Sequence, residues 1–171
     1  MSTFIWGKIK LNRLPESFRS YQRGDIIVYF NLLRDPLYMS ELNEGEIYFN
    51  IACGYEEMVY PLQYKMCCLN CASEFFSLDI PKKKKKREAP EVYFERLFAR
   101  IKRLQEVILE LLNKPEVDRI EYYHTDSASE DSVEEYEFVD WRPEEFAQRF
   151  FEEMEKHAGS TPTIRAVFEK N

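Results

Sequence analysis

The sequence predicts an α+β domain in which a mostly antiparallel sheet carries two main helices packed on one face. Two observations lead to this fold class. Segments at 91–113 and from 142 onward repeat apolar residues at the spacing of an α-helix. Short segments rich in β-branched and aromatic residues surround them. The resulting order of strands, helix, strands, helix and strand fits one layer of helices against one sheet.

The first helix is predicted over 91–113. Large apolar side chains recur there at alternating steps of three and four, which places them on one stripe: Phe94, Leu97, Ile101, Leu104, Ile108 and Leu111. Pro90 suits the first helical turn, and Asn113, Lys114 and Pro115 form a suitable stop. The stripe also matches a coiled-coil seam, but so short a zipper is weak, so we favour packing on the chain's own sheet.

Strands are predicted before this helix at 3–11, 26–33, 46–51, 57–65 and 74–80. Gly24 and Asp25 form a turn before the second strand, and Asn43, Glu44 and Gly45 form another before the third. We expect the strand at 46–51 to pair back on the strand at 26–33.

After the helix, strands are predicted at 118–124 and 133–141, joined as a hairpin across an acidic loop. In the second of these strands, apolar side chains are available to the core: Val133, Tyr136, Phe138 and Trp141. A second helix opens at 142–145, and its apolar face consists of Phe146, Phe150 and Met154. A final strand is predicted at 163–168.

The length of 171 residues and the hydrophobic share of 44% suit a single α+β domain over 1–171, with an exposed basic connector at 82–89. We find no secretory signal and no apolar run long enough to span a bilayer, so we expect a cytoplasmic location. With only five glycines and no phosphate-loop motif, the chain gives no indication of nucleotide binding.

The residues that could act in catalysis or bind a metal ion form no recognisable motif. Cys53, Cys67, Cys68 and Cys71 lack the two separated pairs typical of zinc, so buried structural thiols are the favoured interpretation. His124 stands beside Thr125, Asp126 and Ser127, but triads are assembled in space rather than from neighbours in sequence. His157 near a helix end is better explained by the helix dipole. We expect no catalytic residue, no metal and no cofactor.

Charge is the most informative functional feature. The formal net charge is −7, yet six consecutive cations form a basic patch: Lys82, Lys83, Lys84, Lys85, Lys86 and Arg87. The segment 126–157 carries twelve carboxylates against three cations. Like-signed charge steers association with a partner of opposite sign.

Aromatic residues are interleaved with these acids. Aromatic anchors supply binding energy and surrounding charges steer encounter, so the segment predicts a protein-binding surface for a basic partner. We nominate as partner-binding residues Glu134, Glu135, Tyr136, Asp140 and Trp141. A solvated acidic face that only aids solubility explains the acids equally well.

The predicted αββα-like arrangement of the C-terminal half, together with the acidic surface from Asp126 to Glu155, resembles the small acidic immunity proteins of bacterial toxin–immunity systems. This resemblance implies a non-enzymatic protein that binds and neutralises a cognate, often basic, toxin. One alternative is a nucleic-acid-associated or nuclear accessory protein that uses the basic patch at 82–87. Another is an enzyme, which a stoichiometric metal would indicate.

Overall fold

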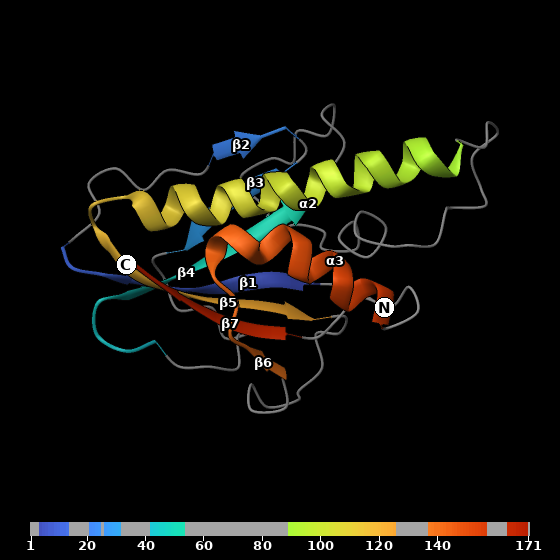
Figure 1. Cartoon of the computed structure of the whole chain (residues 1–171). Coiled ribbons are helices and arrows are strands. Elements are labelled where there is room, and N and C mark those ends of the chain that lie inside the picture. The colour runs from blue at the N-terminus through green and yellow to red at the C-terminus, as the bar shows by residue number, and fades with distance from the viewer. Residues whose placement is uncertain are drawn as a thin grey trace.

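The computed structural model of the chain describes residues 4–13, 21–24, 26–31, 42–53, 89–125, 137–156 and 164–170. They form a seven-stranded sheet with two α-helices packed on one face (Figure 1). The predicted α+β fold is therefore confirmed. The elements in chain order are β1 (Phe4–Leu11), β2 (Tyr21–Arg23), β3 (Ile26–Asn31), β4 (Glu46–Cys53), α2 (Pro90–Asn113), β5 (Val117–Thr125), β6 (Glu137–Val139), the 3-10 turn η2 (Pro143–Glu145), α3 (Phe146–Lys156) and β7 (Ile164–Glu169).

The strand order across the sheet is β2-β3-β4-β1-β5-β7-β6. Neighbouring strands are antiparallel except β6 and β7, which run parallel. The predicted pairing of the third and second N-terminal strands is confirmed by β4 and β3. Gly24 and Gly45 occupy the predicted turns with φ of 59° and 78°, a backbone conformation that favours glycine.

The predicted hairpin between 118–124 and 133–141 is wrong. β7 lies between β5 and β6, so these two strands are not neighbours. The reason is that the chain leaves β6, forms α3 and returns as β7, and parallel neighbours need such a crossover. The six-residue β7 buries Ile164, Ala166 and Phe168 and takes the inner position, which leaves the three-residue β6 at the edge.

The helix α2 matches its prediction at both ends, and five of the six predicted stripe residues are buried. Phe94 is the exception, with 36% of its surface exposed, and Tyr93 is buried in its place. The register of the helix against the sheet decides between these neighbours, since each is aromatic and lies one turn before Leu97.

The helix α3 buries Phe146, Phe150 and Met154, as predicted. Its N-terminus is held by α2, because the Gln105 side-chain oxygen accepts a hydrogen bond from the Ala147 backbone N–H at 2.7 Å. Such a bond satisfies a donor that the first helical turn leaves unpaired. The 3-10 turn η2 directly precedes α3 and occupies the positions 143–145, where the sequence pattern predicted the start of the helix.

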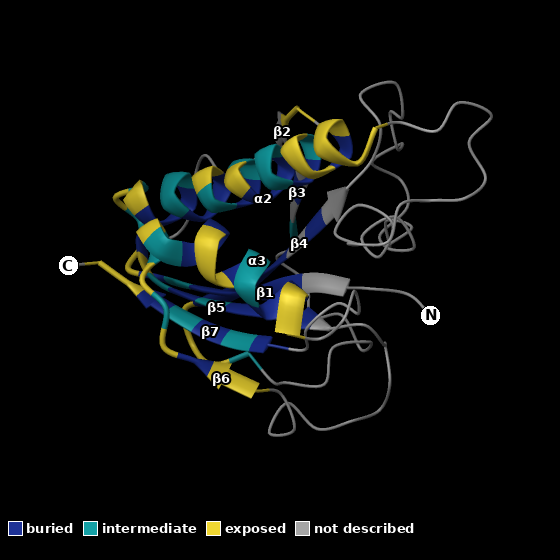
Figure 2. Ribbon diagram, turned by 45° about the vertical axis from the view of Figure 1, so that its right-hand side comes forward, coloured by how far each residue is buried: buried dark blue, intermediate teal, exposed yellow. Residues whose placement is uncertain are grey.

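The main core lies between the sheet and the two helices, and Figure 2 shows buried positions on the sides of α2 and α3 that face the strands. A smaller cluster of Trp6, Tyr48 and Tyr123, with Leu42 packed against it, lies on the other face of the sheet. Neither described helix is long and apolar enough to cross a membrane. The predicted strands at 57–65 and 74–80 lie outside the described residues, and so does the connector at 82–89 except for its last residue, Ala89, which is exposed.

Candidate functional site

The edge strand β6 presents the most exposed large apolar side chain of the described residues. Phe138 is 58% exposed, whereas the next residue, Val139, is buried against the helices. Glu137 and Asp140 on either side of this pair are both exposed. Among the described strands only β7 pairs with β6. An aromatic side chain flanked by carboxylates therefore stands at one end of the sheet.

A row of side chains continues from Phe138 across the sheet face that lies away from the helices. Phe138 is in register with Arg165 of β7, Arg165 with Tyr123 of β5, and Tyr123 with Trp6 of β1. The Arg165 guanidinium carbon lies 5.9 Å from the centroid of the Tyr123 ring, and that ring stacks on Trp6 at 4.2 Å with 10° between planes. The row thus begins with buried rings and ends at the surface.

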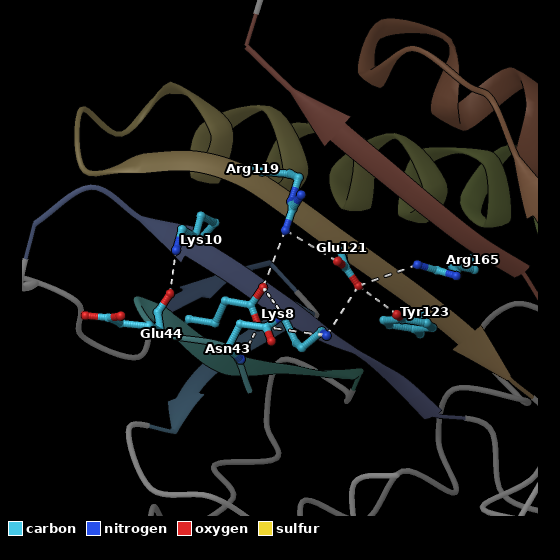
Figure 3. A network of polar contacts seen from close by, with 9 residues as sticks. Lys8, Lys10, Asn43, Glu44, Arg119, Glu121, Tyr123 and Arg165 are labelled. Carbon is cyan, nitrogen blue, oxygen red and sulfur yellow. Dashed lines mark hydrogen bonds and ion pairs between the residues drawn. The ribbon is translucent and has the colours of Figure 1, made fainter. Parts of the chain in front are cut away.

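Glu121 is the centre of a polar network on the same face, beside this row (Figure 3). Its carboxylate accepts a hydrogen bond from the Tyr123 hydroxyl at 2.8 Å and forms ion pairs with Lys8 at 3.5 Å, Arg119 at 3.6 Å and Arg165 at 4.0 Å. These contacts join three strands, β1, β5 and β7. They hold Arg165, whose side chain is 35% exposed, beside Phe138.

Glu46 extends the network to β4. Its buried carboxylate lies 3.8 Å from the Lys8 ammonium and 3.4 Å from the Arg119 guanidinium, and it accepts a hydrogen bond from the Asn43 backbone N–H at 2.8 Å. The same carboxylate therefore ties the turn before β4 to the charged face of the sheet. Ions buried in this way are stable only with partners, and Glu46 and Glu121 have the cations Lys8 and Arg119 in common.

The network changes the protonation behaviour of two of its members. Burial acts to raise the pKa of Glu121, but the hydrogen bond from Tyr123 and the charges of Lys8, Arg165 and Arg119 together hold it below its ordinary value. Burial, followed by the hydrogen bond to Glu121, raises the pKa of Tyr123. Glu121 is therefore a carboxylate and Tyr123 a neutral donor at neutral pH.

The described residues 137–156 are strongly acidic, with seven carboxylates and three cations. Each cation is paired within one turn: Arg142 with Glu145 at 2.9 Å, Arg149 with Glu152 at 3.7 Å and Lys156 with Glu153 at 2.7 Å. The carboxylates that form no ion pair with described residues are Glu137, Asp140, Glu144 and Glu155. A negative potential therefore surrounds the exposed end of β6.

The structure places two of the nominated partner-binding residues. Asp140 is exposed beside β6, as a binding residue requires. Trp141 is half-buried and packs edge-on against the Phe146 ring at 5.9 Å, so its availability to the core is confirmed. The remaining nominations, Glu134, Glu135 and Tyr136, and the basic patch Lys82–Arg87 lie outside the described residues.

Phe138 and Arg165 are the residues that sequence reasoning missed. Phe138 was expected in the core, and this prediction is wrong because Val139 takes the inward position of the strand. The apolar pair Val139 and Trp141, two residues apart, signals this opposite alternation. No signal in the sequence could place Arg165 beside Phe138, since that depends on the pairing of β6 with β7.

Histidine and metal chemistry receive no support from the described part of the chain. His124 is fully buried between Tyr122 and Phe150, and burial lowers its pKa to about 3. It is therefore a neutral core residue. Among the described residues no group of three or more histidine, cysteine or acidic side chains is arranged to hold a metal ion. Cys67, Cys68 and Cys71 lie outside them.

The fold and the edge of β6 define an α+β protein with an acidic, aromatic surface. Comparisons with protein-family models, curated proteins and solved structures found no match to this chain.

Proposed function

We propose that the protein is a non-enzymatic binding module that recognises a basic protein through the β6 end of its sheet. The acidic surface favours an immunity or inhibitor role for this module. In that role the partner is a toxin, and binding neutralises it. The exposure of Phe138 between two exposed carboxylates carries the proposal.

The first support is energetic. Exposed aromatic side chains with a well-packed base are the anchors that dominate protein interfaces. Phe138 is exposed, and Arg165 beside it is held in place by Glu121 and the Tyr123 ring. Because Arg165 is already ordered, its immobilisation on binding costs less entropy than that of a free arginine.

The second support is electrostatic. The four carboxylates without an ion pair among described residues, Glu137, Asp140, Glu144 and Glu155, lie around β6, η2 and α3. Their potential would accelerate encounter with a basic surface and make association sensitive to salt. Glu134 and Glu135 would add to it from the preceding segment.

The test is affinity capture from the native host with the full-length chain, a low-salt wash and stepped-salt elution read by mass spectrometry. Two variants with equal charge change are compared. One carries Glu137→Lys and Asp140→Lys at the β6 edge, and the matched control carries Glu91→Lys and Glu95→Lys on the exposed side of α2.

We expect one stoichiometric basic protein, retained by the wild type and the control and lost by the edge variant. The recovered protein is then purified, and its activity is measured with and without the chain, since an inhibitor must abolish it. Equal retention by both variants, or elution of nucleic acid instead of a protein, would contradict the proposal.

A further inference from the structure

We infer that the partner binds by adding an extended segment to the edge of β6 that no described strand occupies, with its side chains in the order basic, apolar, small, basic. This inference rests on the proposed function and specifies the partner's shape and chemistry. It concerns the backbone of β6 as well as its side chains.

β6 ends the described sheet and pairs with β7 along one edge, so among described elements its other edge has no strand beside it. An open edge offers backbone N–H and C=O groups to another chain, which is how peptides add to sheets in many complexes. Glu137 and Phe138 are both exposed, and Figure 2 shows β6 mostly in the colour of exposed residues at the outer side of the sheet.

The face of β6 away from the helices specifies two side chains of the added strand. A strand added beside β6 would place one side chain next to Phe138 and another next to Asp140 on this face. The neighbour of Phe138 should be apolar, because Arg165 lies on the other side of that ring and would repel a cation. The neighbour of Asp140 should be basic.

The face of β6 that carries α3 specifies the other two side chains. Here the added strand would have side chains next to Glu137 and Val139. Val139 is buried against the helix layer, so its neighbour should be small. Glu137 is exposed and the nearby Lys156 is engaged by Glu153 at 2.7 Å, so a basic side chain suits this position. Together the two faces give the order basic, apolar, small, basic along residues 137–140.

The test uses two short fluorescent peptides, with the central sequence Lys-Leu-Ala-Lys for parallel addition and Lys-Ala-Leu-Lys for antiparallel addition. Their binding to the full chain is measured by anisotropy, and the tighter of the two is the parent. Two further peptides carry N-methyl groups on alternate amides. In one peptide the methylated amides all point to one edge of the extended strand, and in the other they all point to the opposite edge. Only one edge of an added strand can bond to β6, so one methylated peptide should bind at least about tenfold more weakly and the other should bind as the parent does. A peptide with Glu in place of Lys should not bind.

Protein variants locate the site. Phe138→Ser and the pair Glu137→Gln with Asp140→Asn should each weaken the parent peptide by about tenfold or more, whereas Glu91→Gln with Glu95→Gln should have no effect. Equal binding of the two methylated peptides would overturn strand addition, and so would no binding of the parent. Either result leaves the proposed function standing if the captured partner still depends on Glu137 and Asp140.

Discussion

The two faces of the sheet are built from different chemistry. The face under α2 and α3 is covered by a continuous apolar core that includes Ile9, Phe49 and Phe150. The opposite face combines three buried rings, Trp6, Tyr48 and Tyr123, with a network of buried and partly buried charges. Both faces are buried at β1 and β5, but only the second continues to an exposed aromatic at β6.

This difference assigns different tasks to the two faces. Apolar burial contributes free energy in proportion to area and demands little geometric detail. Buried ion pairs contribute less net free energy, because desolvation offsets their attraction, but they are satisfied in few arrangements. In this protein the charged face fixes how β1, β4, β5 and β7 meet, and thereby where Arg165 lies.

The largest effect is expected from the apolar face. Phe150→Ala removes a fully buried ring that stacks on Phe146 at 5.5 Å and lies 4.8 Å from His124. We expect the free energy of unfolding to fall by about 3–5 kcal/mol, as measured by urea denaturation. Phe94→Ala is the matched control. Because Phe94 is partly exposed, this variant should lose much less free energy of unfolding. Equal losses would contradict the division of the core described above.

A smaller loss is expected from the charged face. Lys8→Met keeps an unbranched side chain but leaves Glu46 and Glu121 with Arg119 as their common cation. We expect about 2–3 kcal/mol of destabilisation, because a buried carboxylate loses compensation. Adding Glu46→Gln should recover part of the loss, since it removes one of the two carboxylates. A double variant less stable than Lys8→Met alone would show that the pairing is not the cause.

The two faces also differ in how far the sequence predicts them. The helix layer follows from local periodicity, so α2 and the buried face of α3 were predicted correctly from spacing alone. Spacing could not decide between Tyr93 and Phe94, or between Phe138 and Val139, since both members of each pair are apolar. The candidate site requires the order β5-β7-β6, which brings Tyr123, Arg165 and Phe138 together from distant segments. The charge pattern in the sequence indicated the acidic region. Only the strand pairing shows that Phe138 is the exposed aromatic residue within it.

His124 gives the apolar face a pH dependence. Its pKa is lowered to about 3 by burial, against an ordinary value of 6.5, so the unfolded chain binds one proton more than the folded chain between these values. Stability from this residue is full above pH 6.5 and falls as the pH drops through that window, by about 1.4 kcal/mol per pH unit. The unfolded imidazole is already half protonated at pH 6.5, so we expect a loss of about 1 kcal/mol from this residue on going from pH 6.5 to about 5.5.

Urea denaturation across this range measures the effect. His124→Gln should flatten the dependence of unfolding free energy on pH, whatever its effect on stability at pH 7. His157→Gln, which removes the only other histidine, is the matched control and should keep the slope. An unchanged slope in His124→Gln would mean that the imidazole accepts a proton in the folded state.

The smallest effect on the free energy of unfolding is expected from Phe138, at the exposed end of the sheet. Phe138→Ser replaces a ring that is 58% exposed, so the free energy of unfolding should change by less than about 0.5 kcal/mol. The same substitution should abolish capture of the basic partner, because the ring serves the interface rather than the core. Urea denaturation and affinity capture of one preparation separate the two roles. A large loss of stability would place Phe138 in the folding core and remove the main argument for a binding surface at β6.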